Sequence, residues 1–174
     1  MSTEMTILRA YLTAQREHIL GILADLDDEA LRRPVLPSGW SCLGLVAHLT
    51  YDVERIWFTA VAGGDSSAID LGVDGWQVPP DRSAEAVFAA YRRAIADADA
   101  VLASASPEQQ PAWWPANRFG DWRLENIRDL VLHVITETAC HAGHLDAARE
   151  LIDGRRWLVL DGSGVPTDEA VAAG

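Results

Sequence analysis

The 174-residue chain is poor in cysteine, in basic residues and in long apolar runs. Its two cysteines, Cys42 and Cys140, cannot build a disulfide framework, so we expect free thiols and a reducing, cytoplasmic compartment. Basic residues number 14 against 26 acidic ones, and this net charge of -12 argues against nucleic acid and anionic membrane surfaces as partners. No apolar run approaches the length of a membrane span, and the N-terminus lacks the apolar core of a signal peptide.

Helical periodicity appears in four segments, which are separated by loops rich in proline, glycine and aspartate. The first segment carries an apolar stripe from Leu8 to Leu26 and is expected to be capped by Thr3 or Thr6. A further short turn is expected over 27–31. The boundaries expected for the other three helices are Ser41 to 63–64, Ser83 to Leu102, and about Leu124 to 153–154.

This organisation predicts an all-α fold, a four-helix bundle with a long crossover between helices 2 and 3. The bundle is expected to occupy residues 1–157, and residues 158–174 are expected to form a poorly ordered C-terminal tail. The crossover, 63–82, and the connection 104–123 are long for a compact domain. Loops of this length are often functional covers.

A carboxylate and an imidazole lie one turn apart on the inward face predicted for the last helix. Residues four apart are stacked neighbours on a helix, so Glu137 and His141 can converge on one point. A divalent cation would compensate the acid, because carboxylate oxygen and neutral imidazole nitrogen are normal ligands. The alternative is that Glu137 pairs with an arginine and His141 is a hydrogen-bonded core histidine.

A third ligand has to come from another helix, and His48 is the natural candidate. It lies beside the apolar stripe of the second helix, and Asp52, one turn later, is placed to accept a hydrogen bond from its ring. The spacing differs from ferritin-type di-iron sites, which need Glu-x-x-His motifs on two helices. We therefore expect a single-metal site formed by His48, Glu137 and His141.

The residues His133-Val-Ile-x-Glu137-Thr-Ala-Cys-His141-Ala-Gly-His144-Leu-Asp146 resemble the last-helix signature of the DinB-like superfamily. More narrowly, they resemble an uncharacterised actinobacterial branch near mycothiol-dependent maleylpyruvate isomerase. The segment from Gly39-Trp40 to His48, followed by Glu54-Arg55-x-Trp57, is similar to the second helix of that branch. The resemblance covers the chain up to Gly154 and implies a four-helix bundle whose metal ligands are the same three side chains. Many members carry histidine where this chain has Glu137.

The resemblance also implies a chemistry, because relatives include isomerases and S-transferases that use low-molecular-weight thiols such as mycothiol. Three protein ligands leave open positions on a metal, which is typical of catalytic sites. We expect the ion to activate a cosubstrate thiolate that attacks a small electrophile, with His144 or His133 relaying a proton. The ion is expected to be zinc or nickel, with iron or manganese as alternatives, and the resemblance also implies a homodimer.

Aromatic and basic residues precede the last helix and are candidates for substrate binding. Trp113, Trp114 and Trp122 can form an apolar wall over the metal or simply anchor the loop. Arg118 and Arg123 are candidates for meeting a substrate carboxylate. Cys140 turns away from the ligand sector and is expected to be a packing residue.

Other functions stay open at this stage. One is a metal-dependent hydrolase with hydroxide as nucleophile, and two histidines with one carboxylate also suit iron and oxygen chemistry. A second class is a non-catalytic, stress-associated metal-binding protein whose ion is structural. A third is an interaction module without metal.

Overall fold

Every regular element in the described residues, 2–69, 74–115 and 118–157 of the computed structural model, is helical. This confirms the predicted all-α class. The expected tail at 158–174 lies outside the described residues. The elements are α1 (Thr3–Ile22), α2 (Asp28–Arg32), α3 (Cys42–His48), the π-helix η1 (Leu49–Ala62), the 3₁₀ turn η2 (Ser66–Ala68), α4 (Ala84–Ser104) and α5 (Ile127–Asp153).

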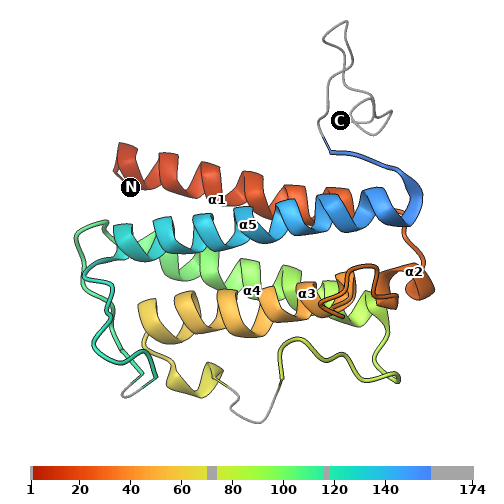
Figure 1. The fold of residues 1–174 in the computed structure, drawn as a ribbon. Coiled ribbons are helices and arrows are strands. Elements are labelled where there is room, and N and C mark those ends of the chain that lie inside the picture. Colours follow the sequence, from red (N-terminus) through yellow and green to blue (C-terminus); the bar gives the residue numbers. More distant parts are fainter. Residues whose placement is uncertain (1, 70–73, 116–117, 158–174) are drawn as a thin grey trace, which may run out of the picture.

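The long helices pack in two pairs (Figure 1). α1 lies along α5, and α4 lies along η1, which continues α3 without a break. Members of each pair run in the same direction, so the chain between η1 and α4 returns along the length of the molecule (Figure 1). None of the helices in the described ranges is long and apolar enough to cross a membrane.

Several helix boundaries follow the predicted capping chemistry. The hydroxyls of Ser41 and Ser83 accept hydrogen bonds from the backbone N–H of the third residue of α3 and of α4. Gly154 follows α5 with φ of 84°, a left-handed conformation that glycine adopts without strain. Asp27 caps α2, which confirms the short turn expected over 27–31.

Two expected starts were wrong. The cap of α1 is Ser2, whose hydroxyl accepts from Met5 N–H, while the Thr6 hydroxyl donates to the Ser2 carbonyl. The last helix begins at Ile127, after the cap Asn126, and not near Leu124. The reason is tertiary, since the first two N–H groups of α5 donate to the carbonyls of residues 109 and 107 in the preceding loop.

The second long helix departs from the expected α-helical geometry. From Leu49 to Ala62 it is π-helical, with a terminal bond from Gly63 N–H to the Phe58 carbonyl, five residues back, at 2.8 Å. A chain bonded in this way turns less per residue than an α-helix, so a 3.6-residue wheel misplaces its faces. Thr50 and Glu54, which fall off the expected apolar stripe, are each 1% exposed.

A buried ion network joins three of the helices. The guanidinium of Arg16 on α1 donates to both carboxylate oxygens of Glu54 on η1, at 2.7 and 2.6 Å, and to Asp99 on α4 at 3.0 Å. Burial alone would lower the pKa of Arg16, but the two carboxylates raise it above its usual value. Burial raises the pKa of Glu54, and the guanidinium opposes that shift. The charge on Glu54 therefore depends on Arg16.

Candidate metal centre

Three side chains that can hold a metal ion converge where the end of α3 meets the middle of α5. They are His48, Glu137 and His141, and their ligand atoms all lie within 4.8 Å of one another. Glu137 Oε1 is 3.2 Å from His141 Nε2 and 3.9 Å from His48 Nε2. Helix geometry alone brings the α5 pair together, whereas His48 reaches them through the packing of α3 and η1 on α5.

Both imidazoles present Nε2 to the shared point, and a neighbour contacts Nδ1 of each ring. Nδ1 of His48 is 2.9 Å from Asp52 Oδ2. Nδ1 of His141 is 3.4 Å from Nδ1 of His144. A proton on Nδ1 leaves the Nε2 lone pair free, which is the tautomer that a metal ligand needs. Asp52 and His144 thus contact the atoms that set the tautomer of the two rings.

The spacing and the partners of Glu137 fit a cation. Bonds of about 2.0–2.2 Å to nitrogen and oxygen place neighbouring ligand atoms roughly 3–4 Å apart. Among the described residues, Glu137 makes ion pairs with His48 and His141 and not with an arginine. The arrangement in which an arginine neutralises Glu137 is therefore absent from this part of the chain.

The centre is less enclosed than the sequence indicated. The Glu137 side chain is 37% exposed, while those of His48 and His141 are 13% and 11% exposed. Glu137 thus lies at an accessible edge and not in the apolar interior. The cost of burying an acid does not by itself demand a metal; the convergence of three ligand atoms is the stronger argument. The open side leaves room for an exogenous ligand.

Burial shapes the protonation of the histidines on α5. It lowers the pKa of His141, and the nearby imidazole of His48 adds to the shift against the opposing charge of Glu137. Burial also lowers the pKa of His133, although Glu137 acts in the opposite direction. Near neutral pH both rings are therefore neutral, the form in which an imidazole binds a metal or accepts a proton.

A tryptophan that was not among the sequence candidates covers the centre. The Trp76 ring stacks on His48 with centroids 4.2 Å apart and planes 16° apart, and it meets the edge of His141 at 5.8 Å. Its turn is built by Asp74, whose carboxylate accepts from Trp76 N–H and whose carbonyl accepts from Gln77 N–H. An Asp-Gly pair marks this turn in the sequence, but nothing local indicates that its tryptophan lies against His48.

Two glycines let the Trp76 turn approach the centre. A Cβ on Gly75 would lie 2.0 Å from Asp52 Oδ2, and one on Gly44 would lie 2.5 Å from the Trp76 carbonyl oxygen. Neither contact is possible between real atoms. Glycine is needed at position 44, where the clash is with backbone, whereas a side chain at position 75 would have to displace either the Asp52 carboxylate or the turn.

We predict that Gly75→Ala weakens metal binding about 10- to 100-fold, because the new methyl group must push Asp52 from His48 or push the turn outward. Competition with a chromogenic chelator measures this. Gly143→Ala is the matched control, since a Cβ there meets nothing within 4 Å. Equal affinity in Gly75→Ala and wild type would contradict the role assigned to this contact.

The predicted tryptophan wall forms a cluster around His133, one turn from Glu137 toward the N-terminus of α5. Trp114 and Trp122 pack with Trp57 and Phe119, and His133 meets Trp57 at 4.7 Å and Trp122 at 5.4 Å. The predicted wall therefore contacts His133, whereas the tryptophan that contacts His48 and His141 is Trp76. Further positions in this loop are Trp113, whose N–H donates to the Val61 carbonyl, Arg123, over the Trp114 ring at 5.6 Å, and Arg118, over the Phe119 ring at 5.9 Å.

The two cysteines are free, as predicted, and lie in different environments. Cys42 is buried, and burial raises its thiol pKa to about 11, so it stays protonated. Cys140 is exposed, so its expected packing role was wrong.

Residues 7–154 match the family model described as Mycothiol-S-transferase. Searches of curated proteins and of solved structures found no match. The matched range includes all three side chains of the centre and the Trp76 turn.

Proposed function

The chain belongs to the mycothiol-S-transferase family of the DinB-like superfamily, and from this premise we propose that it is a metal-dependent enzyme joining a low-molecular-weight thiol to a small electrophile. The observation that supports this most directly is the convergence of His48, Glu137 and His141 at an accessible edge. Three protein ligands and an open side suit a site that admits a further ligand.

The three side chains hold the ion in this proposal, and Asp52 orients His48 through its Nδ1. When bound, a divalent ion supplies Lewis acidity that lowers the pKa of a thiol. Zinc or nickel suits two imidazoles and one carboxylate, and iron or manganese is the alternative. The lowered pKa of His141 favours the neutral ring that this ligand role requires.

The transfer of the thiol to the electrophile needs neither an oxidant nor a reductant. The cosubstrate thiol gives up its proton, and its sulfur forms a bond to an electrophilic carbon of the second substrate. The leaving group departs with the electron pair of the bond that breaks. In an isomerisation the sulfur adds to an unsaturated carbon and leaves again after rotation about the intervening bond.

His133 and His144 are the proposed proton acceptors. His133 is neutral near pH 7 because burial lowers its pKa, and it lies between the aromatic cluster and Glu137. His144 contacts His141 through Nδ1. We further propose that the Trp114 and Trp122 cluster takes an apolar electrophile, and that Trp113, Arg118 and Arg123 border that subsite.

The proposal is tested by titrating the cobalt-substituted protein with N-acetylcysteine and mycothiol. Thiolate binding is expected to produce a sulfur-to-cobalt absorption band that saturates at one thiol per ion. The titration is repeated in Cys140→Ser, because the exposed thiol of Cys140 could itself bind cobalt and give a similar absorption band. If neither thiol gives a band, thiol transfer is excluded.

Two competing functions give different results in the same titration. A hydrolase would cleave activated esters without added thiol and show no thiolate band. A structural ion would raise the melting temperature but admit neither thiol. Cytoplasmic location and a homodimer belong to the same proposal, and gel filtration with light scattering tests the homodimer.

A further inference from the structure

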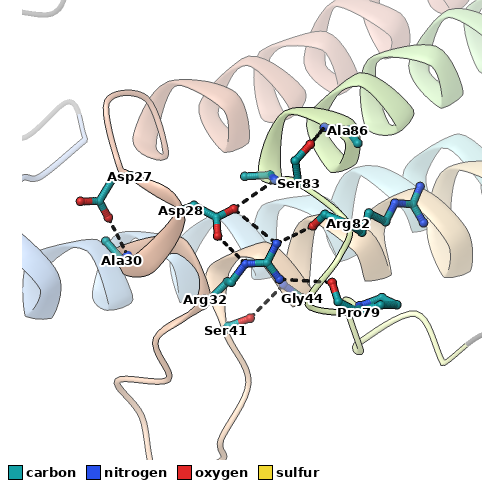
Figure 2. A network of polar contacts seen from close by, with 11 residues as sticks. Asp27, Asp28, Ala30, Arg32, Ser41, Gly44, Pro79, Arg82, Ser83 and Ala86 are labelled. Atoms are coloured by element: carbon teal, nitrogen blue, oxygen red, sulfur yellow. Dashed lines mark hydrogen bonds and ion pairs between the residues drawn. The ribbon is translucent and has the colours of Figure 1, made fainter.

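The return segment, residues 74–82, carries the tryptophan of the metal centre and is tied to α2 just beyond it. Figure 2 shows the Arg32 guanidinium of α2 paired with Asp28. The same guanidinium donates to the backbone carbonyls of Pro79 and Arg82. One charged side chain of α2 therefore holds the end of the return segment in place.

The beginning of the return segment is held just as closely. The Asp74 carboxylate accepts a hydrogen bond from the backbone N–H of Trp76 at 3.0 Å. The Trp76 carbonyl oxygen approaches α3 so closely that a Cβ on Gly44 would lie 2.5 Å from it. Because its backbone is fixed on both sides, Trp76 presents its indole to the face of His48.

Two contacts set the orientation of the His48 ring. Asp52 accepts at the ring edge, 2.9 Å from Nδ1, but the Asp52 side chain is itself 30% exposed. Trp76 covers the ring face, with centroids 4.2 Å apart and planes 16° apart, and so restricts tilting of the imidazole. In this orientation Nε2 lies 3.9 Å from Glu137 Oε1, and the edge of the His141 ring meets His48 at 5.0 Å.

Resting on the metal centre of the proposed function, we propose that Trp76 is a positioning residue for metal binding. It holds the His48 imidazole with Nε2 towards Glu137 and His141 before an ion is bound, so binding costs less ordering of that ring. An indole N–H is a hydrogen-bond donor and offers no lone pair to a cation. Trp76 therefore acts through His48 and not as a ligand.

The test measures nickel affinity of the full-length protein by competition with a chromogenic chelator. Trp76→Leu and Trp76→Met remove the flat face and are expected to weaken binding about 10-fold, whereas Trp76→Phe keeps a stacking face and stays within about threefold of wild type. Trp157→Leu is the matched control, because Trp157 stacks on His18, an imidazole outside the centre, at 4.9 Å and 14°. The control should bind nickel as wild type does.

A double-mutant cycle separates positioning from a general structural role. In the His48→Ala background, Trp76→Leu is expected to cause no further loss of nickel affinity, because the ring that it positions is gone. Without metal, NMR is expected to show the His48 ring protons shifted upfield by the indole, and this shift should disappear in Trp76→Leu.

The outcomes distinguish this inference from the proposed function. Equal nickel affinity in wild type, Trp76→Leu and Trp76→Met overturns the positioning role and leaves thiol transfer standing. The same holds if Trp76→Leu causes an equal loss with and without His48. A wild-type protein that binds no nickel overturns the inference together with the metal-dependent function. Nickel affinity that depends on Trp76 in a protein that gives no thiolate band supports the inference and removes thiol transfer alone.

Discussion

Replacing His141 with alanine is expected to weaken metal binding at least about 100-fold, so that the purified variant carries almost none of the ion retained by wild type. Even partners that only orient a ligand account for 10- to 100-fold in affinity, and His141 contributes a ligand atom itself. It lies 3.2 Å from Glu137 and is the most buried member of the centre. Elemental analysis of both proteins after identical purification measures the effect.

His18→Ala is the matched control for this experiment. His18 pairs with Asp146 at 2.7 Å and stacks on Trp157, so its loss removes an imidazole without touching the centre. The control should keep its full metal content. Full metal content in His141→Ala would remove the central assignment, provided that circular dichroism shows both variants folded.

Arg16→Met is expected to cost about 3–5 kcal/mol of unfolding free energy, the largest stability effect we predict. Methionine keeps the length of the side chain but leaves the Glu54 carboxylate, 1% exposed, without its counter-charge. Asp99 is 38% exposed and can be solvated, so Glu54 dominates the loss. Urea denaturation of wild type and variant measures the difference.

The pH dependence of stability distinguishes the unpaired charge of Glu54 from lost packing as the cause of this effect. In Arg16→Met, burial and the nearby charge of Asp99 both act on Glu54, so its folded pKa rises above the ordinary 4.5. The variant therefore regains stability as pH falls through that raised pKa towards 4.5, because a protonated Glu54 needs no partner. The double variant Arg16→Met, Glu54→Leu should recover most of the loss at pH 7. If the loss of unfolding free energy is the same at pH 7 and near pH 4.5, and persists in the double variant, its cause is lost packing instead.

The candidate site was partly predictable because one of its contacts is local. The α-helix places residues four apart on one face, so the Glu137–His141 pair follows from spacing alone. The pairing of His48 with Asp52 follows similarly, although here α3 passes into η1. The meeting of His48 with Glu137 was inferred by elimination and by family resemblance, since nothing local relates residues so far apart in the chain.

The covering of the site and the buried charges were not predicted. Trp76 belongs to a loop whose path depends on two close approaches, at Gly44 and Gly75, that no periodicity reveals. The burial of Glu54 was not predicted, because a helical wheel with 3.6 residues per turn was applied to a segment that is π-helical. Its partner, Arg16, is a charged residue on a helix whose buried side was judged from apolar residues alone.

The sequence by itself determined the all-α class, the caps Ser41 and Ser83 and the stacked acid and imidazole on the last helix. These depend on contacts within a few residues, which backbone geometry dictates wherever a helix forms. Only the tertiary structure decided that Glu137 lies at an accessible edge and that Trp76 stacks on His48. Those features arise from packing between distant segments, where side-chain shape and the paired charges of α2, η1 and α4 determine which surfaces meet.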